Sequence, residues 1–208
     1  MIIAVDGPAA SGKGTIARAL AGTLGLPYMD TGLLYRATAL NLLAMGGDPE
    51  SEFAAARATD LSQIDMADPE LKSETVGGIA SRISTYKLVR EALLDRQRRF
   101  AASDGGAVLD GRDIGTVISP EADVKLFVTA SAEARARRRF DELKASGLDV
   151  HFTDVLADIR ARDERDSGRE QAPLVMADDA VLLDTSEMSI EEAIASALAA
   201  VEQRMGGG

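Results

Sequence analysis

The sequence predicts an α/β fold in which helices pack on a parallel β-sheet as a three-layer sandwich. The chain begins with an unbroken apolar run, Ile2–Val5, which is typical of a strand buried on both faces of such a sheet. A glycine-rich turn follows, and residues 13–24 then show helical spacing, with Ile16, Leu20 and Leu24 on one face. Further apolar runs alternate with helical stretches, which is the element order of strands joined by crossover helices.

The other elements follow from the same two periodicities. Strands are expected at residues 28–30, 107–110, 124–129 and 181–184. Helices are expected at residues 33–44, 88–102, 131–145, 153–165 and from 189 onward. A capping box of Ser189 and Glu192 opens the last helix. Its expected apolar stripe comprises Ile190, Ile194, Leu198 and Val201, and the terminal glycines are expected to fray.

Composition limits the possible functions. The 208 residues, 46% of them hydrophobic, fit a single domain over residues 1–208. The net charge of −11 disfavours nucleic acid and anionic membranes as partners, and the absence of Cys excludes a thiol nucleophile and a Cys-based zinc site. No run approaches the length of a membrane span or resembles a signal peptide. We therefore expect a cytoplasmic protein, and we expect it to be a monomer.

A phosphate-binding motif follows the first predicted strand directly. It consists of Gly7, Pro8, Ala9, Ala10, Ser11, Gly12, Lys13, Gly14 and Thr15. Such a loop turns backbone N–H groups toward phosphate at a helix N-terminus, and Lys13 would reach the β- and γ-phosphates of ATP. Thr15 would face Mg²⁺, directly or through water. A dinucleotide-binding fingerprint, Gly12-x-Gly14-x-x-Ala17, overlaps the motif but begins well after the strand, which disfavours it.

Arginine is unusually frequent, with 18 Arg against 5 Lys. A guanidinium group binds phosphate bidentately, so this bias suits an anionic ligand, although GC-rich codon usage would also produce it. The three consecutive arginines at 137–139 could contact a phosphate, or they could form a solvated face paired with Asp141 and Glu142. Asp110 ends a predicted strand beside the loop, where an acid either holds Mg²⁺ through water or shapes the turn.

Several motifs, in order along nearly the whole chain, resemble the bacterial cytidylate (CMP) kinases among the nucleoside monophosphate kinases. Besides residues 7–15, with their Gly-Lys-Gly-Thr ending, they are residues 30–36 (DTGLLYR), 89–94 (VREALL), 110–116 (DGRDIGT), 162–169 (RDERDSGR) and 172–174 (APL). The resemblance implies a P-loop kinase that uses MgATP to phosphorylate CMP or dCMP. It also implies a small acceptor-binding insert, here at residues 45–80, and an Arg-rich lid, here at residues 137–169.

The resemblance also assigns the acceptor site by position. The acceptor phosphate would be held by Arg36, Arg112 and Arg169, which with Lys13 are the catalytic candidates. The cytosine edge would be read by Ser81, Arg90 and Asp113, and the ribose would be held by Arg162 and Asp166. Thr31 and Tyr35 complete the expected CMP-binding residues.

These residue types suit cytosine, which presents an amino donor beside a ring-nitrogen acceptor. Uracil reverses that pattern, so a matching site would leave buried polar groups unpaired with UMP. Two alternatives remain at this point. One is a related small-molecule kinase acting on AMP, UMP or shikimate, and the other is a nucleotide-dependent switch protein. The insert shows no alternating strand pattern, so short helices are expected there.

Overall fold

The computed structural model describes residues 1–206, which belong to two compact units. The first unit comprises Met1–Met29 and Ala101–Gly208, and the second comprises Asp30–Phe100. The expected fraying of the last glycines falls in part on Gly207 and Gly208, which lie outside the described residues. None of the helices among residues 1–206 is both long and apolar enough to cross a membrane.

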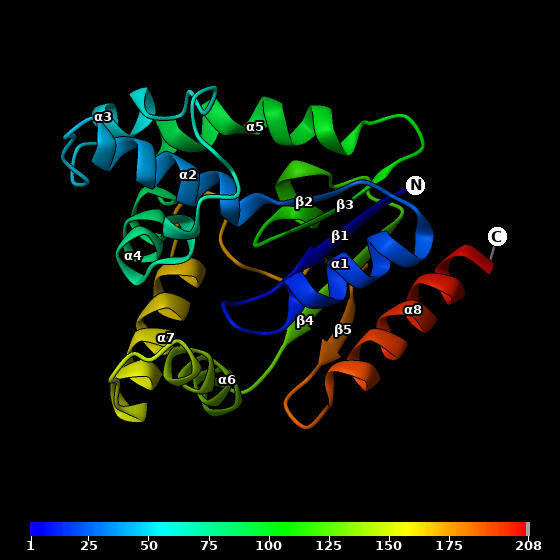
Figure 1. The fold of residues 1–208 in the computed structure, drawn as a ribbon. Coiled ribbons are helices and arrows are strands. Elements are labelled where there is room, and N and C mark those ends of the chain that lie inside the picture. Colours follow the sequence, from blue (N-terminus) through cyan, green and yellow to red (C-terminus); the bar gives the residue numbers. More distant parts are fainter. Residues whose placement is uncertain (207–208) are drawn as a thin grey trace. The chain divides into compact units, whose positions relative to one another are not determined.

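A five-stranded sheet forms the centre of the first unit (Figure 1). Its strand order is β2 (Tyr28–Asp30), β3 (Ala107–Gly111), β1 (Ile2–Asp6), β4 (Val124–Thr129) and β5 (Val181–Asp184). β1 pairs in parallel with both β3 and β4, and β4 pairs in parallel with β5. The predicted α/β fold with a parallel sheet flanked by helices is therefore confirmed.

Two helices cover one face of this sheet, α1 (Lys13–Leu24) and α8 (Ile190–Gly206), and Figure 1 shows them side by side. The expected capping box is present, since Ser189 N–H donates to Glu192 Oε2 at 2.8 Å and Glu192 N–H donates to Ser189 Oγ at 3.2 Å. The expected stripe was wrong at Ile190, which is 63% exposed. Val201 is buried as expected, and Ile194 and Leu198 pack partly buried against the core. The buried face also carries Ala193 and Ala197, because small residues allow close approach to α1.

A second pair of helices, α6 (Ala132–Ala145) and α7 (Phe152–Ser167), packs together through an aliphatic cluster. The cluster also includes Ala9 of the phosphate loop. The rings of Phe140 and Phe152 meet edge to face, with centroids 6.1 Å apart. A π-helical turn, η2 (Ile114–Ile118), follows β3 and was not expected, because five residues are too few to show periodicity.

The second unit is built from helices. In order they are α2 (Thr31–Ala44), α3 (Glu52–Arg57), the 3₁₀ turn η1 (Pro69–Lys72), α4 (Glu74–Ile83) and α5 (Lys87–Ala101). α2 begins at Asp30, whose carboxylate accepts the Leu33 N–H at 3.1 Å, and it packs mainly on α4. The expectation of short helices in the irregular segment after residue 47 is confirmed.

Candidate active site

The backbone conformation of the phosphate loop depends on glycine at two positions, Gly7 and Gly12. Gly7 lies so close to β4 that a Cβ there would overlap the carbonyl oxygen of Val128. Ala10 and Gly12 adopt positive φ angles of 58° and 87°. Gly12 is the N-cap of α1 and offers no side chain to the helix end. The loop therefore brings bare backbone and the positive end of the α1 dipole to one place, as binding an anion requires.

Hydrogen bonds to backbone carbonyls hold the phosphate loop in place. The carbonyl of Ser11 accepts hydrogen bonds from Thr185 Oγ1 at 3.0 Å and from Arg138 Nη1 at 3.4 Å. The carbonyl of Ala9 accepts from Arg135 Nη1 at 3.3 Å. Lys13 Nζ donates across the loop to the carbonyl of Pro8 at 3.3 Å. These bonds occupy carbonyl oxygens, which would otherwise repel a phosphate.

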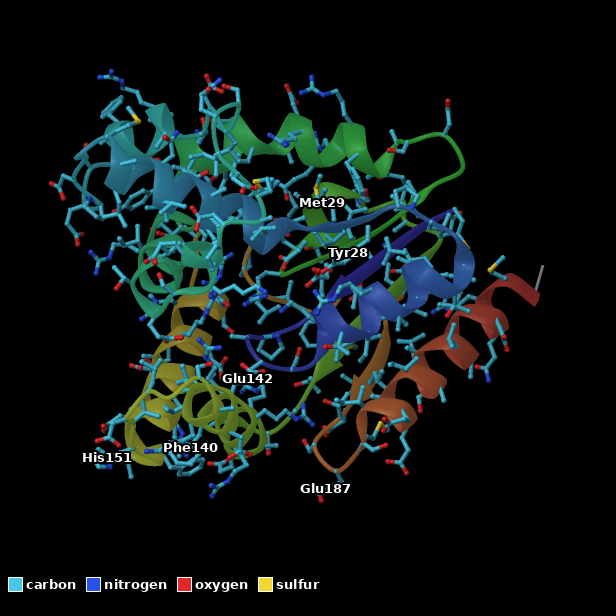
Figure 2. The ribbon with its side chains drawn as sticks, viewed as in Figure 1. Tyr28, Met29, Phe140, Glu142, His151 and Glu187 are labelled. Atoms are coloured by element: carbon cyan, nitrogen blue, oxygen red, sulfur yellow. The ribbon has the colours of Figure 1, made fainter. Side chains whose placement is uncertain are left out.

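Asp110, at the end of β3, lies beside the start of α1. Its Oδ1 accepts the hydroxyl proton of Tyr28 at 2.6 Å, and Tyr28 is labelled in Figure 2. A Cβ built on Gly14 would lie 3.6 Å from Asp110 Oδ2. In the usual phosphate loop the residue at the position of Gly14 carries the hydroxyl that binds Mg²⁺. The carboxylate of Asp110 thus lies next to the place where that hydroxyl would start.

These oxygen donors suit Mg²⁺ chemically. A carboxylate and a hydroxyl are hard ligands, and Mg²⁺ usually retains several waters in sites shared with phosphates. Among residues 1–206, no three His, Cys, Asp or Glu side chains gather closely enough to form an all-protein metal site. The residues present therefore fit an ion held largely by phosphate oxygens and water.

A buried carboxylate joins the arginines of two further motifs. Asp166, on α7, is 1% exposed and accepts from Arg112 Nε at 2.7 Å. It also accepts a hydrogen bond from Arg169 Nη2. Burial by itself would raise the pKa of Asp166, but the charges of Arg112, Arg169 and Arg162 and the hydrogen bond from Arg112 hold that pKa below its usual value. Four of the predicted CMP-binding residues therefore lie together in the first unit.

Asp6, the last residue of β1, is a buried carboxyl that sequence reasoning did not single out. It accepts the N–H groups of Ile114 and Gly115, both at 2.8 Å, just after Asp113. Burial raises the pKa of Asp6 to about 7, and the charge of Asp113 adds to the rise, although the two backbone N–H groups and Lys13 oppose it. Its position directly after a buried strand was the only available sequence signal.

Asp113 also lies in the first unit, whereas the other five predicted CMP-binding residues lie in the second. Arg36, on α2, donates from Nη1 to the carbonyls of Leu71 at 2.8 Å and Ser73 at 3.3 Å. A Cβ on Gly77 of α4 would lie 2.8 Å from Arg36 Nη2, so this glycine makes room for the guanidinium.

A second arginine of that unit is almost completely buried. Arg90, on α5, is 8% exposed and donates from Nη1 to the hydroxyl of Tyr35 at 3.3 Å and the carbonyl of Ser84 at 3.4 Å. Thr31 and Ser81 are each 4% exposed. These buried polar groups form the polar interior of the helical unit.

The three arginines at 137–139 differ from one another. Arg139 donates to Glu142 at 3.0 Å, as a solvated face would have it, and Glu142 is labelled in Figure 2. Arg138 instead turns to Thr185 and the phosphate loop. The guanidinium of Arg137 lies over the ring of Phe152, 4.5 Å from the ring centroid. The sequence could not predict these different contacts, because all three arginines have similar neighbours along the helix.

Comparison with known proteins identifies the family. Residues 3–203 match the family model described as Cytidylate kinase. The chain belongs to the cytidylate kinase family. It is 59% identical to a cytidylate kinase from Xanthobacter autotrophicus, with both chains fully covered, and 55% identical to one from Caulobacter vibrioides, covering 97% of this chain and 95% of the other. The resemblance stated from the motifs is thereby confirmed.

A solved structure of an uncharacterized protein from Eubacterium ventriosum is similar in fold. The TM-score is 0.56 and the identity 12%, over 97% of this chain and 98% of the other. At this identity the similarity bears on the fold alone. The family assignment therefore depends on the family model and on the sequence relatives.

Proposed function

We propose that this member of the cytidylate kinase family transfers the γ-phosphoryl group of ATP to CMP or dCMP, giving ADP and CDP or dCDP. The observation that carries the proposal is the buried Asp166 bridging Arg112 and Arg169 in the same unit as the phosphate loop. A nucleotide switch needs a phosphate loop but no cluster of guanidinium groups for a second phosphate. A kinase with a phosphate acceptor needs both.

The chemistry is an in-line displacement. An oxygen of the acceptor phosphate attacks the γ-phosphorus, and the bond to the β–γ bridging oxygen breaks, leaving ADP. The acceptor is already anionic, so no strong base is required. Lys13 stabilises the charge on the transferred group, while Arg36, Arg112 and Arg169 neutralise and orient the acceptor phosphate.

Mg²⁺ would be held by the phosphates, with Asp110 and Thr15 contacting it directly or through water. The ion supplies charge neutralisation of the phosphate oxygens when it is bound. The phosphate loop supplies backbone N–H groups, and Tyr28 orients Asp110 by donating to one of its oxygens. The second oxygen of Asp110 lies on the side of Gly14.

Selectivity for cytosine is assigned to Ser81, Arg90 and Asp113. Asp113 would accept from the amino group of cytosine, and Arg90 and Ser81 would donate to its ring nitrogen and carbonyl oxygen. All three are less than 9% exposed, so a base with the reversed pattern would leave desolvated groups unpaired. Arg162 and Asp166 would hold the ribose, and Thr31 and Tyr35 would line the base site.

Residues 45–80 are proposed as the acceptor-binding insert and residues 137–169 as the lid. Their closure would exclude water, which otherwise would accept the phosphoryl group and convert the kinase to an ATPase. Because both substrates are free nucleotides, a cytoplasmic monomer is sufficient for the reaction.

A coupled assay for ADP tests the proposal. We expect CMP and dCMP to turn over faster than UMP, AMP, dTMP and shikimate under the same MgATP concentration. A higher kcat/KM for AMP or UMP would overturn the assignment of the base. ATP hydrolysis with no phosphorylated small molecule under any acceptor would instead favour the switch protein.

A further inference from the structure

One arginine of α6 touches three separate elements of the first unit. Arg135 has a side chain that is 5% exposed. Its Nε donates to the carbonyl of Ala130, directly after β4, at 2.8 Å. Its Nη1 donates at 3.3 Å to the carbonyl of Ala9 in the phosphate loop. Nη1 and Nη2 also form a two-pronged pair with the carboxylate of Asp163 on α7, at 2.8 and 2.7 Å.

This set of contacts requires the shape of a guanidinium group. The planar fork of Arg matches both oxygens of a carboxylate, while its remaining N–H groups point elsewhere in the same plane. A lysine ammonium cannot span the three acceptors at once. Because the group is buried, removal of either partner would leave a charge or a carbonyl without compensation.

The two ends of this bridge lie in functionally different segments. Ala9 belongs to the loop proposed to hold ATP. Asp163 immediately follows Arg162 and precedes Asp166 by three residues, and Asp166 binds Arg112 and Arg169. The side chain of Arg135 therefore connects the carboxyl-terminal half of α7 to the phosphate loop.

We propose that Arg135 is a positioning residue that ties the acceptor-binding half of α7 to the phosphate loop. The inference rests on the proposed function for what each segment binds. The role proposed for Arg135 requires no contact with either substrate. By holding Asp163 and the Ala9 carbonyl at fixed positions relative to each other, Arg135 sets the distance between the attacking oxygen and the γ-phosphorus. The rate of an in-line transfer depends steeply on that distance.

Apolar packing alone would not fix this separation. The cluster between α6 and α7 includes Val155 and Ile159, which lie in the first half of α7. Beyond Ile159, α7 makes polar contacts with α6 from Arg160 to Glu133 and from Asp163 to Arg135. The first of these is an exposed pair, with side chains 59% and 60% accessible, whereas the guanidinium of Arg135 in the second is buried.

The exposed pair provides a matched control, because it joins the same two helices. We would compare Arg135→Lys, Asp163→Asn, their double variant and the control Glu133→Gln at a temperature well below each melting point. The expected result is a fall in kcat of about tenfold to a hundredfold for each single variant. The double variant should be no slower than the slower single variant, because both changes break one bridge. Glu133→Gln should remain within about twofold of the unchanged protein.

A merely structural role would lower the melting temperature and leave kcat per folded molecule unchanged, and that outcome would overturn the proposal. So would fully additive losses in the double variant. Hydrogen exchange of the unliganded protein supplies a readout independent of substrate. Amides of residues 9–14 and 162–167 should exchange faster together in Arg135→Lys, by about tenfold, but not in Glu133→Gln.

The two readouts separate the inference from the proposed function. If the unchanged protein fails to phosphorylate CMP while the paired increase in exchange is observed, the proposed function fails and the bridge stands. If CMP is phosphorylated but neither segment responds to Arg135→Lys, the bridge is wrong and the proposed function stands.

Discussion

Arg112 and Asp166 are 54 positions apart in the chain, yet the Nε of the first lies 2.7 Å from the Oδ2 of the second. One follows the end of β3 and the other lies on α7, so the pair connects two motifs that are distant in sequence. Asp166 is almost completely buried, and its negative charge is balanced by arginines proposed to bind the acceptor. The carboxylate thus holds guanidinium groups in place while leaving a net positive charge for a phosphate.

Removal of that carboxylate should weaken the binding of CMP. In Asp166→Ala, Arg112 and Arg169 lose their common partner and repel each other, so we expect the KM for CMP to rise by about tenfold or more, with the KM for ATP changed much less. Steady-state kinetics with each substrate varied in turn would measure this. Asp158→Ala, on an exposed position of the same helix, is the control. An unchanged KM for CMP would detach Asp166 from the acceptor site.

Lys13→Ala should abolish most turnover without unfolding the protein. The side chain is partly exposed and donates to the Pro8 carbonyl within the same loop, so we expect the fold to survive its truncation. We expect kcat to fall by about a hundredfold or more, because a charge on the transferred group goes unbalanced. Thermal melting and the coupled assay would be run in parallel with Lys87→Ala, an exposed lysine paired with Glu91. Normal turnover of Lys13→Ala would exclude Lys13 from the mechanism.

Two adjacent glycines of α4 allow a test of the place of Arg36. In Gly77→Ala the new methyl group would lie 2.8 Å from Arg36 Nη2 and displace the guanidinium, whereas at Gly78 nothing lies within 4 Å. Both changes add helix propensity, worth about 0.5–1 kcal/mol in a helix interior. We therefore expect Gly78→Ala to be stabilised with normal kinetics, and Gly77→Ala to show a raised KM for CMP. Equal kinetics in the two variants would contradict a role for Arg36 in acceptor binding.

Asp6 should make stability depend on pH near neutrality. The pKa of its carboxyl is about 7 in the folded protein, against the ordinary pKa of 3.8 in the unfolded chain. Between these values the folded state binds more protons, so the contribution of Asp6 to the free energy of unfolding falls as the pH rises. The stability of Asp6→Asn relative to the unchanged protein should therefore improve from about pH 5 to about pH 8 in urea titrations.

Asp184→Asn is the matched control for that titration. The hydrogen bonds from Ser186 lower the pKa of the exposed Asp184. The contribution of Asp184 to the free energy of unfolding is therefore lost only as the pH falls toward and below its unfolded pKa. Between about pH 5 and about pH 8 its effect should be constant. If Asp6→Asn behaves in the same flat way, the Asp6 carboxyl does not carry its proton into the neutral range.

The sequence predicted the elements well wherever pattern and termination signals agreed. Residues 13–24 became α1 as expected, because Gly25 and Pro27 mark its end as clearly as its spacing marks its course. The same holds for the capping box of Ser189 and Glu192. The error at Ile190 arose because hydropathy favours the larger side chain, whereas helix packing here favours the face formed by Ala193 and Ala197.

The candidate site was predictable in part. Motifs at residues 110–116 and 162–169 indicated arginines for an anion, and the structure brings Arg112, Asp166 and Arg169 together. The bridge of Arg135 to Asp163 and Ala9 was not predictable, because it depends on three elements meeting in space. The roles of the individual substrate-binding residues remain predictions.

The register between β1 and β3 determines where the segments after these two strands begin. Val5 lies opposite Asp110, and Asp6 opposite Gly111, so the residues that follow β1 and β3 leave the sheet at the same level. Because side chains alternate between the two faces of a strand, a slip of one position would exchange the residues on the two buried faces, and a slip of two would shift one segment by about 7 Å. Buried aliphatic residues such as Ile3 and Val108 thereby fix the relative positions of the two segments that are proposed to bind the nucleotides.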